Sequence, residues 1–204
     1  MSTEALKRYY RLHAPIYDAT RWAFLFGRTR LIQVLSRSSG APKQILDLGC
    51  GTGKNLCALA KAFPQAQITG VDLSAAMLAQ AGRNLVQKLD PNARARISLR
   101  NTDIAQMPGM QYDLIVCSYM LSMTGNQLAQ TLQKLQKLLT PTGRLAIVDF
   151  DNTRAHWFAR WMGVNHVRMD GALATLLQQQ FPHIELHEQH SGLGLWRWLL
   201  WIGR

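Results

Sequence analysis

The chain has 204 residues, of which 48% are hydrophobic and 17% are charged. This composition is typical of a globular domain with a substantial core, and it excludes an intrinsically disordered chain. The formal net charge of +11 favours an acidic partner: a nucleic acid, an anionic membrane or an anionic small molecule.

The first 43 residues are the most basic part of the chain, with eight Lys or Arg against two acids. Residues 3–13 predict a short basic helix, and apolar spacing predicts a second helix over 16–37 that ends at the Gly- and Pro-containing stretch 38–42. We interpret residues 1–43 as an N-terminal helical cap. The start of the chain has no apolar signal segment, and no apolar run approaches the roughly 18 residues needed to span a bilayer.

From residue 44 onward, short apolar runs alternate with helical patterns. Strands are predicted at 44–48, 67–73, 95–101, 112–118 and 143–150, and helices from the glycine loop to about 63, over 74–89, over 127–139 and within 154–180. Two further runs, 183–189 and 195–203, predict a closing antiparallel pair. Strands that alternate with helices predict a mostly parallel sheet covered on both faces. Residues 44–204 are therefore expected to form one α/β domain.

The most informative segment is DLGCGTG, residues 47–53, between the first strand and its helix. Glycines allow a sharp turn and close approach of a ligand, and the helix N-terminus offers free N–H groups. A P-loop is excluded because Asn55 follows Lys54 and Leu48 stands five positions before the last glycine. A dinucleotide fingerprint is excluded because Lys54 takes its last glycine position. Asp47 would repel a pyrophosphate and suits a cationic group, such as the ammonium of an amino acid.

Two further acids follow later strands. Asp72 lies 19 residues beyond Gly53, where a carboxylate can accept both hydroxyls of a ribose. Asp103 follows the third strand, where it can accept from an adenine amino group with Ile104 against the ring. Each acid alone has an ordinary alternative as a helix cap or turn residue. Because three acids follow successive strands, we expect a ligand at the carboxyl edge of the sheet.

Taken together, these segments resemble class I S-adenosylmethionine-dependent methyltransferases. The resemblance rests on residues 47–53, 71–72, 103–104, 112–115 and 139–144 and covers about 44–150. It implies a Rossmann-like fold, with a seven-stranded, mostly parallel sheet, helices on both faces and an antiparallel last strand. It also implies S-adenosyl-L-methionine as methyl donor and S-adenosyl-L-homocysteine as product. The donor-binding residues that it implies are Asp47, Gly49, Gly51, Thr52, Gly53, Asp72, Leu73, Asp103, Ile104, Cys117 and Ser118.

Nucleic acid is the first acceptor to test against the charge. Enzymes that methylate base amino groups often carry Asn/Asp-Pro-Pro-aromatic after the fourth strand, where this chain has Cys-Ser-Tyr-Met at 117–120. The Pro-Cys pair of cytosine C5 enzymes does not occur. Nucleic acid is therefore disfavoured, although the basic charge leaves RNA as an alternative. The six histidines are scattered and the three cysteines lack metal-ligand spacing, so no metal site or disulfide framework is expected and a reducing, cytoplasmic setting is predicted.

The two ends of the chain resemble bacterial lipid N-methyltransferases. The segments that carry this likeness are 9–32, 161–171 and 195–204. The likeness is closest to the betaine-lipid enzymes that methylate diacylglyceryl-homoserine, with phosphatidylethanolamine methyltransferases more distant. It implies stepwise N-methylation of the lipid head-group amine to the trimethylated form. The alternatives are a phosphatidylethanolamine N-methyltransferase, an RNA methyltransferase, or a methyltransferase that acts on a small molecule such as a quinone.

The cations and aromatic residues of 16–30 suit a membrane interface, where aromatic rings lie at the apolar boundary. We therefore expect peripheral association with the inner face of the cytoplasmic membrane, with an anionic surface and a lipid head group as partners. The alternative is that these aromatics are core residues of a covering helix. Tyr17 and Tyr119 are the predicted catalytic residues, because their ring faces can hold methylated cations. The substrate candidates are Tyr10, Arg21, Trp22, Arg28, His166 and Arg168.

Overall fold

The computed structural model describes residues 27–37, 40–164, 166–192 and 194–204. The predicted helix over 3–13 and the first part of the helix over 16–37 lie outside these ranges. The predicted site residues Tyr10, Tyr17, Arg21 and Trp22 lie outside them as well.

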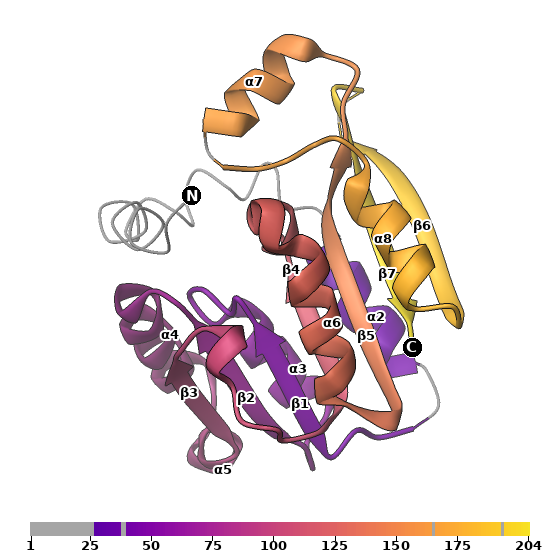
Figure 1. Ribbon diagram of the computed structural model, residues 1–204. Helices are drawn as coiled ribbons and strands as arrows, with labels where there is room; N and C mark the ends of the chain where they lie inside the picture. The colour runs from indigo at the N-terminus through magenta and orange to yellow at the C-terminus, as the bar shows by residue number, and fades with distance from the viewer. Residues whose placement is uncertain (1–26, 38–39, 165, 193) are drawn as a thin grey trace.

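A seven-stranded sheet with the order β3-β2-β1-β4-β5-β7-β6 forms the centre of the described molecule (Figure 1). Its strands are β1 (Gln44–Leu48), β2 (Gln67–Asp72), β3 (Ile97–Asn101), β4 (Tyr112–Ser118), β5 (Leu139–Asn152), β6 (Ile184–Gly192) and β7 (Trp196–Gly203). The first five strands pair in parallel, whereas β7 runs antiparallel between β5 and β6. The predicted sheet with an antiparallel last strand is confirmed.

Helices cover both faces of this sheet. They are α2 (Arg28–Arg37), α3 (Lys54–Ala62), α4 (Ala75–Lys88), α5 (Pro91–Ala95), α6 (Leu128–Leu138), α7 (His156–Val164) and α8 (Ala172–Gln180), with short 3₁₀ turns η1 (Ile104–Gln106), η2 (Leu121–Met123) and η3 (Gly125–Gln127). One core cluster joins the sheet to α2, α3 and α4, and the other joins it to α6 and α8. The two neighbours Ile45 and Leu46 belong to different clusters, because successive side chains of a strand point to opposite faces.

The sequence-based boundaries are wrong at two helices. The helix predicted over 16–37 does not run through Gly27, whose φ of 88° is left-handed, and α2 begins at Arg28. A Cβ at Gly27 would lie 2.3 Å from the Trp198 ring, so this turn requires glycine. The helical region predicted over 154–180 is two helices: α7 ends at Val164, and α8 begins after Gly171, whose φ of 74° is left-handed.

The short helix α5 was not predicted, although its sequence carries ordinary start signals. Asp90 accepts a hydrogen bond from the Ala93 N–H, and Pro91 occupies the first turn. Strand β5 also begins earlier than predicted, at Leu139 rather than Gly143. Among the described residues no helix is long and apolar enough to cross a membrane.

Candidate active site

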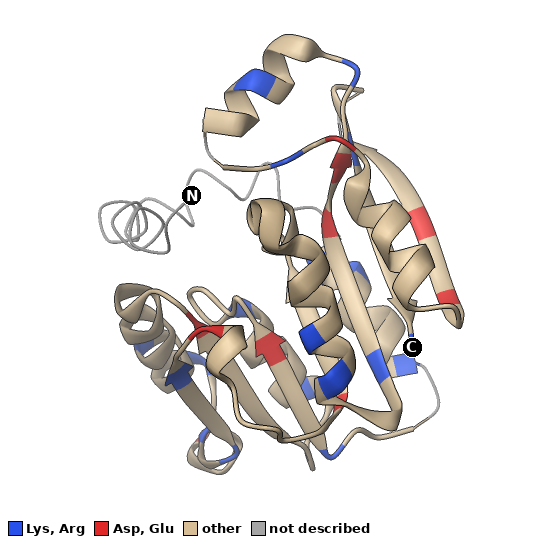
Figure 2. Cartoon of the chain, in the orientation of Figure 1, with Lys and Arg blue, Asp and Glu red and all other residues tan. Residues whose placement is uncertain are grey.

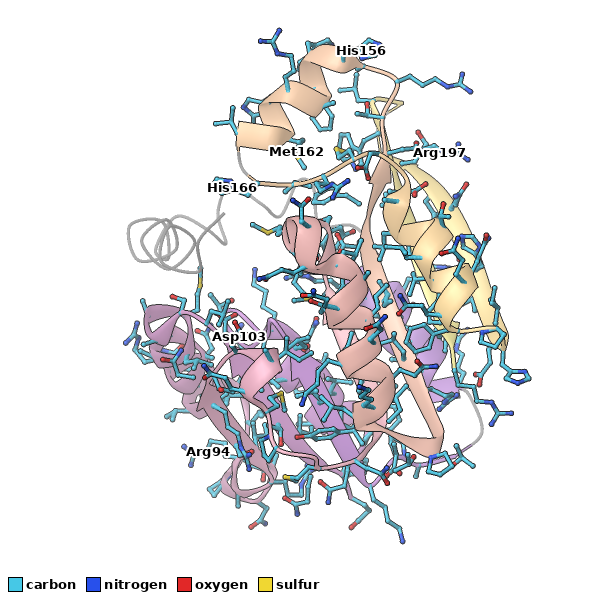
Figure 3. The ribbon with its side chains drawn as sticks, viewed as in Figure 1. Arg94, Asp103, His156, Met162, His166 and Arg197 are labelled. Atoms are coloured by element: carbon cyan, nitrogen blue, oxygen red, sulfur yellow. The ribbon has the colours of Figure 1, made fainter. Side chains whose placement is uncertain are left out.

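A cavity of about 630 Å³ opens where the parallel strands end. Its walls come from the loops after β1, β2, β3 and β4, from the start of α6, from Arg28 of α2 and from the segment after α7. Figure 3 shows Asp103 and His166, which both line this cavity, at well separated positions. The fold places segments from six parts of the chain around one space. Its volume lies within the range of about 300–1,000 Å³ of small-molecule sites.

The glycine loop forms one wall of the cavity. Its turn is held by the Val71 carbonyl, which accepts from the N–H groups of Gly49 and Cys50 at 2.8 and 3.0 Å. Gly49 and Gly51 have left-handed φ values of 69° and 53°. A Cβ at Gly49 would lie 2.9 Å from the Met120 side chain, whereas a Cβ at Gly51 would meet no protein atom within 4 Å. Gly49 therefore permits close packing of two loops, and Gly51 keeps the cavity side of the loop open.

Asp47 lies beneath this loop and is fully buried. Asn55 Nδ2 donates to Asp47 Oδ1 at 3.3 Å and to Ser118 Oγ at 2.8 Å. Asp47 Oδ2 has no hydrogen-bond partner among the described residues. Burial raises the pKa of this carboxyl to about 7, although the Asn55 hydrogen bond and the charge of Arg28 oppose the rise. Asp47 thus brings a costly buried charge close to the cavity floor.

We expect Asp47→Asn to raise the melting temperature at pH 8 by at least about 3 °C. The native pKa of about 7 lies above the ordinary carboxyl value, so the native state binds the extra proton between about pH 4 and pH 7. The free energy of unfolding therefore falls as the pH rises from about 4 to about 7. Above about pH 7, Asp47 is ionised and its full destabilising effect is present. The neutral amide removes that effect.

Thermal unfolding of both proteins at pH 5 and pH 8 measures this effect. Asp90→Asn is the matched control, because Asp90 is an exposed cap whose pKa is lowered by its hydrogen bond from Ala93 N–H and asparagine caps equally well. An Asp47→Asn protein no more stable than the parent at pH 8 would mean that the native state does not carry this charge.

Asp72 and Asp103 face the cavity at the ends of β2 and β3. Asp72 Oδ2 accepts from the Gly51 N–H at 2.9 Å, and Oδ1 accepts from the Ser74 N–H at 2.8 Å. Burial raises the pKa of Asp72 above its ordinary value. Ser74, not Asp72, caps α4. Asp103 does cap a turn, because its Oδ1 accepts from Ala105 N–H at 2.9 Å at the start of η1.

Tyr119 lines the cavity where β4 ends, across β1 from the side of Asp72 and Asp103. Its ring packs edge-on against Phe150 at 4.9 Å, and the Arg28 guanidinium carbon lies 5.7 Å from the ring centroid. Burial raises the pKa of Tyr119, and the nearby Asp149 raises it further, so the phenol stays protonated at neutral pH. Arg28 Nε is buried and donates to no acceptor among the described residues. Tyr119 and Arg28 both line the cavity, and Arg28 Nε can donate a hydrogen bond there.

Tyr119 and His166 are the non-glycine residues with positive φ in the described ranges, at 55° and 63°. Both line the cavity. Such backbone conformations are costly and concentrate at functional sites. The strain therefore independently marks this cavity as the functional site.

Arg168 fixes the segment that closes the cavity beyond α7. Its guanidinium donates to the Asp170 carboxylate and to the Gly125 carbonyl, and its N–H donates to the Ser122 carbonyl. These bonds tie residues 166–171 to the turns η2 and η3. Many of the N–H groups of Arg168 are therefore hydrogen-bonded within the protein, which weakens the prediction that Arg168 binds substrate.

The sequence comparisons agree on one family. A family model described as "Methyltransferase domain" matches residues 46–145. Malonyl-[acyl-carrier protein] O-methyltransferase of Priestia megaterium is 34% identical over 154 residues, which cover 74% of this chain and 53% of that protein. Trans-aconitate 2-methyltransferase of Deinococcus radiodurans is 40% identical over 104 residues, which cover 51% of this chain and 36% of that protein. The chain carries a class I, S-adenosylmethionine-dependent methyltransferase domain.

The chain spans about half the length, or less, of these two curated relatives. A solved structure, the [4+2]-cyclase SpnF, superposes with a TM-score of 0.79 at 15% identity over 100% of this chain and 97% of SpnF. The 1,6-didemethyltoxoflavin N1-methyltransferase of Burkholderia thailandensis gives a TM-score of 0.70 at 16% identity over 98% and 86% of the two chains. At these identities the structural neighbours show the fold alone. The cyclase illustrates that this fold alone does not define the reaction.

The methyltransferase cavity collects most of the donor-binding residues predicted from the sequence. Eight line it: Gly49, Gly51, Thr52, Asp72, Leu73, Asp103, Ile104 and Ser118. Asp47, Gly53 and Cys117 are not among the lining residues. Cys117 is fully buried in the core cluster on the α6 and α8 side of the sheet, on the face opposite to its neighbour Val116. The predicted catalytic and substrate residues that the structure describes all line the cavity. They are Arg28, Tyr119, His166 and Arg168.

Sequence reasoning missed other lining residues of the methyltransferase site. Asn55 lies in the first turn of α3 and joins Asp47 to Ser118. The polar residues Thr124, Asn126, Gln127 and Gln130 line the cavity from the segment that leads into α6. Their signal was available, because a helix after β4 must start at the same sheet edge as the glycine loop.

The described residues fit the donor of this enzyme class. Two carboxylates stand on the side of β2 and β3, and the glycine at position 51 leaves space that any larger residue would fill. Asp47 Oδ2 is a buried acceptor that lacks a partner within the described ranges, as expected beside a cationic ligand group. The residues that would hold the donor are therefore Gly49, Gly51, Asp72, Asp103 and Ile104, with Asp47 acting through its charge.

Proposed function

We propose that this chain transfers a methyl group from S-adenosylmethionine to a small molecule that carries a carboxylate. The observation that carries the proposal is the separation of charge within one cavity. The carboxylates that line it, Asp72 and Asp103, follow β2 and β3, whereas Arg28 lies over the Tyr119 ring. Figure 3 shows Asp103 well separated from His166, which follows α7. Two lysines, Lys54 and Lys134, also line the cavity, and Lys134 donates to the Met107 carbonyl. A cationic donor fits the acidic side, and an anionic acceptor fits the other.

On the donor side, Asp72 accepts from the ribose hydroxyls while it keeps its bonds from Gly51 and Ser74. The bound donor supplies a methyl group on a positively charged sulfur, which a nucleophile displaces in line. The buried charge of Asp47 stabilises that positive ligand, which in turn favours the ionised carboxylate. The protein's main contribution is alignment of the two reactants.

On the acceptor side, a carboxylate needs no general base, because it is already ionised at neutral pH. Burial raises the pKa of Tyr119, so its phenol stays protonated and does not act as a base. Arg28 adds a guanidinium whose Nε has no acceptor among the described residues, and guanidinium pairs well with carboxylate. The names of the two curated relatives, which act on malonyl and trans-aconitate groups, support an acidic acceptor.

A lipid head-group amine is the second candidate, with diacylglyceryl-homoserine as the best example. The observation that favours it is the exposed aromatic face of α7 next to the cavity, with Trp157 63% exposed. This head group carries a carboxylate beside its amine, so it would meet the same cations. The amine must lose a proton before it attacks, and His166 is the ionisable base in the described acceptor side of the cavity.

A donor-turnover assay tests the proposal. The purified chain is incubated with methyl-labelled donor and, separately, with di- and tricarboxylic acids, a malonyl thioester, RNA, and vesicles of diacylglyceryl-homoserine or phosphatidylethanolamine. Methyl esters release volatile methanol in alkali, whereas N-methyl and C-methyl groups are stable. We expect alkali-labile label in an acid. Alkali-stable label in a lipid would replace the first candidate with the second, and the absence of any turnover would overturn both.

In the same assay, Arg28→Gln is expected to raise KM for the acceptor about tenfold, because one charge-assisted hydrogen bond is lost. KM for the donor should not change. The matched control is Arg83→Gln, since Arg83 lies on the exposed face of α4 and bonds only to Gln80 in the described structure. A rise in the donor KM instead would assign Arg28 to the carboxylate of the donor.

A further inference from the structure

Helix α7 carries an apolar face whose side chains are about half exposed or more. Trp157, Trp161 and Val164 are 63%, 48% and 76% exposed. Their spacing of four and three residues puts them on one side of the helix. Phe158 and Met162 face the protein and are buried. The helix therefore has two apolar stripes, and only one of them serves the core.

The charged residues of α7 and its flanking segments, 152–169, are all basic. Arg154 and Arg160 flank the exposed stripe, and residues 152–169 contain no Asp or Glu. Neither arginine has an acidic partner among the described residues, and Asp170, the next acid along the chain, already pairs with Arg168. Figure 2 shows basic colouring on α7 and on the segment just before it, and no acidic residue on the helix. An exposed apolar stripe bordered by cations is complementary to an anionic, partly apolar surface.

The position of α7 in the fold favours one class of partner over another. The helix projects from the body of the molecule, beyond the ends of β4 and α6 (Figure 1). A stable protein partner needs roughly 800 Å² on each side, which a single projecting helix of nine residues does not provide. A bilayer surface needs no such matching area, because it is flat and fluid and accepts a few anchoring side chains.

We propose that α7 docks this protein onto an anionic bilayer, with Trp157, Trp161 and Val164 at the level of the head groups and Arg154 and Arg160 against lipid phosphates. The C-terminal end of α7 leads directly into the cavity wall, because Gly163 and His166 line the cavity. Docking through α7 therefore brings the mouth of the cavity to the membrane surface. The proposal concerns binding alone and does not depend on which acceptor is methylated.

The test is sedimentation of the full chain with vesicles of phosphatidylcholine alone or mixed with phosphatidylglycerol, without donor or acceptor. We expect binding to the anionic vesicles only, and weaker binding at high salt. Trp157→Ala with Val164→Ala should lower the affinity at least about tenfold through lost apolar contact. Arg154→Gln with Arg160→Gln should lower it about 25-fold, or roughly fivefold for each cation.

The control is Val86→Ala, which truncates a similarly exposed valine (61%) on α4 and should bind as the parent does. Circular dichroism and donor affinity check that the α7 variants fold, since their buried residues Phe158 and Met162 are unchanged. Unaltered vesicle binding in both double variants would overturn the proposal. The proposal would also be overturned if the α7 variants kept vesicle binding but lost a concentration-dependent dimer or the binding of an acidic protein. The partner of α7 would then be a protein. Failure of the turnover assay would leave this result unaffected.

Discussion

Replacing Asp72 with alanine is expected to weaken S-adenosylmethionine binding by at least about 100-fold. Asp72 supports the site in two ways, since its carboxylate holds the Gly51 and Ser74 N–H groups and faces the cavity with the lone pairs that remain. Each hydrogen bond to a charged group contributes about 1.5–3 kcal/mol, so the loss of two ribose contacts accounts for the expected change. Isothermal titration calorimetry measures it directly.

The matched control for Asp72→Ala is Asp90→Ala. Asp90 also accepts a backbone N–H at the start of a helix, from Ala93 at 2.9 Å, but it lies outside the cavity lining. Its removal should cost a little stability and leave donor affinity unchanged. Equal donor affinity in the parent and Asp72→Ala would contradict the ribose assignment. A loss of affinity in both variants would indicate general destabilisation.

Gly51→Ala is expected to lower donor affinity by at least about 30-fold while the protein still folds. The φ of 53° is unfavourable for alanine, which costs about 1–2 kcal/mol. The added methyl meets no protein atom within 4 Å, so it enters the space of the ligand. Overfilling a site of this kind typically costs a further 1–3 kcal/mol or so. Donor titration and thermal unfolding separate the two effects.

Gly82→Ala provides the comparison for Gly51→Ala. Gly82 lies inside α4, and a Cβ there also meets no protein atom within 4 Å. Alanine in a helix interior should stabilise the protein by about 0.5–1 kcal/mol without changing donor affinity. If Gly51→Ala binds donor as well as Gly82→Ala does, the glycine loop is not part of the ligand site.

The two ends of the chain were less predictable than its middle. The strands and the glycine loop follow from short apolar runs and contiguous residues, which are local features. Gly27 ends a helical pattern that periodicity alone would continue, and its reason is the Trp198 ring from the far end of the sequence. The region predicted as one helix over 154–180 likewise divides, because α7 ends at Val164 and the intervening segment is bonded to the turns η2 and η3 through Arg168. A pattern of apolar residues cannot reveal such contacts.

The lipid assignment remains a proposal that rests on the likeness of the termini. The two curated relatives described above match 154 and 104 residues of this chain, and their names give malonyl and trans-aconitate groups as acceptors. The structure adds the exposed stripe of α7, which no periodicity argument identified, because Trp157 and Phe158 are adjacent in sequence and differ only in which one packs against the core. The membrane association expected of the N-terminal segment stays a prediction, and the proposal for α7 adds a defined helix on which membrane binding can be tested.

From the sequence by itself came the class of the fold, the glycine loop and the acids Asp72 and Asp103, because each is written in contiguous residues next to a recognisable strand. Only the tertiary structure decided how these parts meet. The strand order β3-β2-β1-β4-β5-β7-β6 gathers the strand ends at one edge and adds Arg28, Tyr119 and His166 from distant segments. It also places Asp47 beneath the cavity wall and Cys117 on the other face of the sheet. These outcomes depend on contacts between residues far apart in the chain, which no local pattern of side chains specifies.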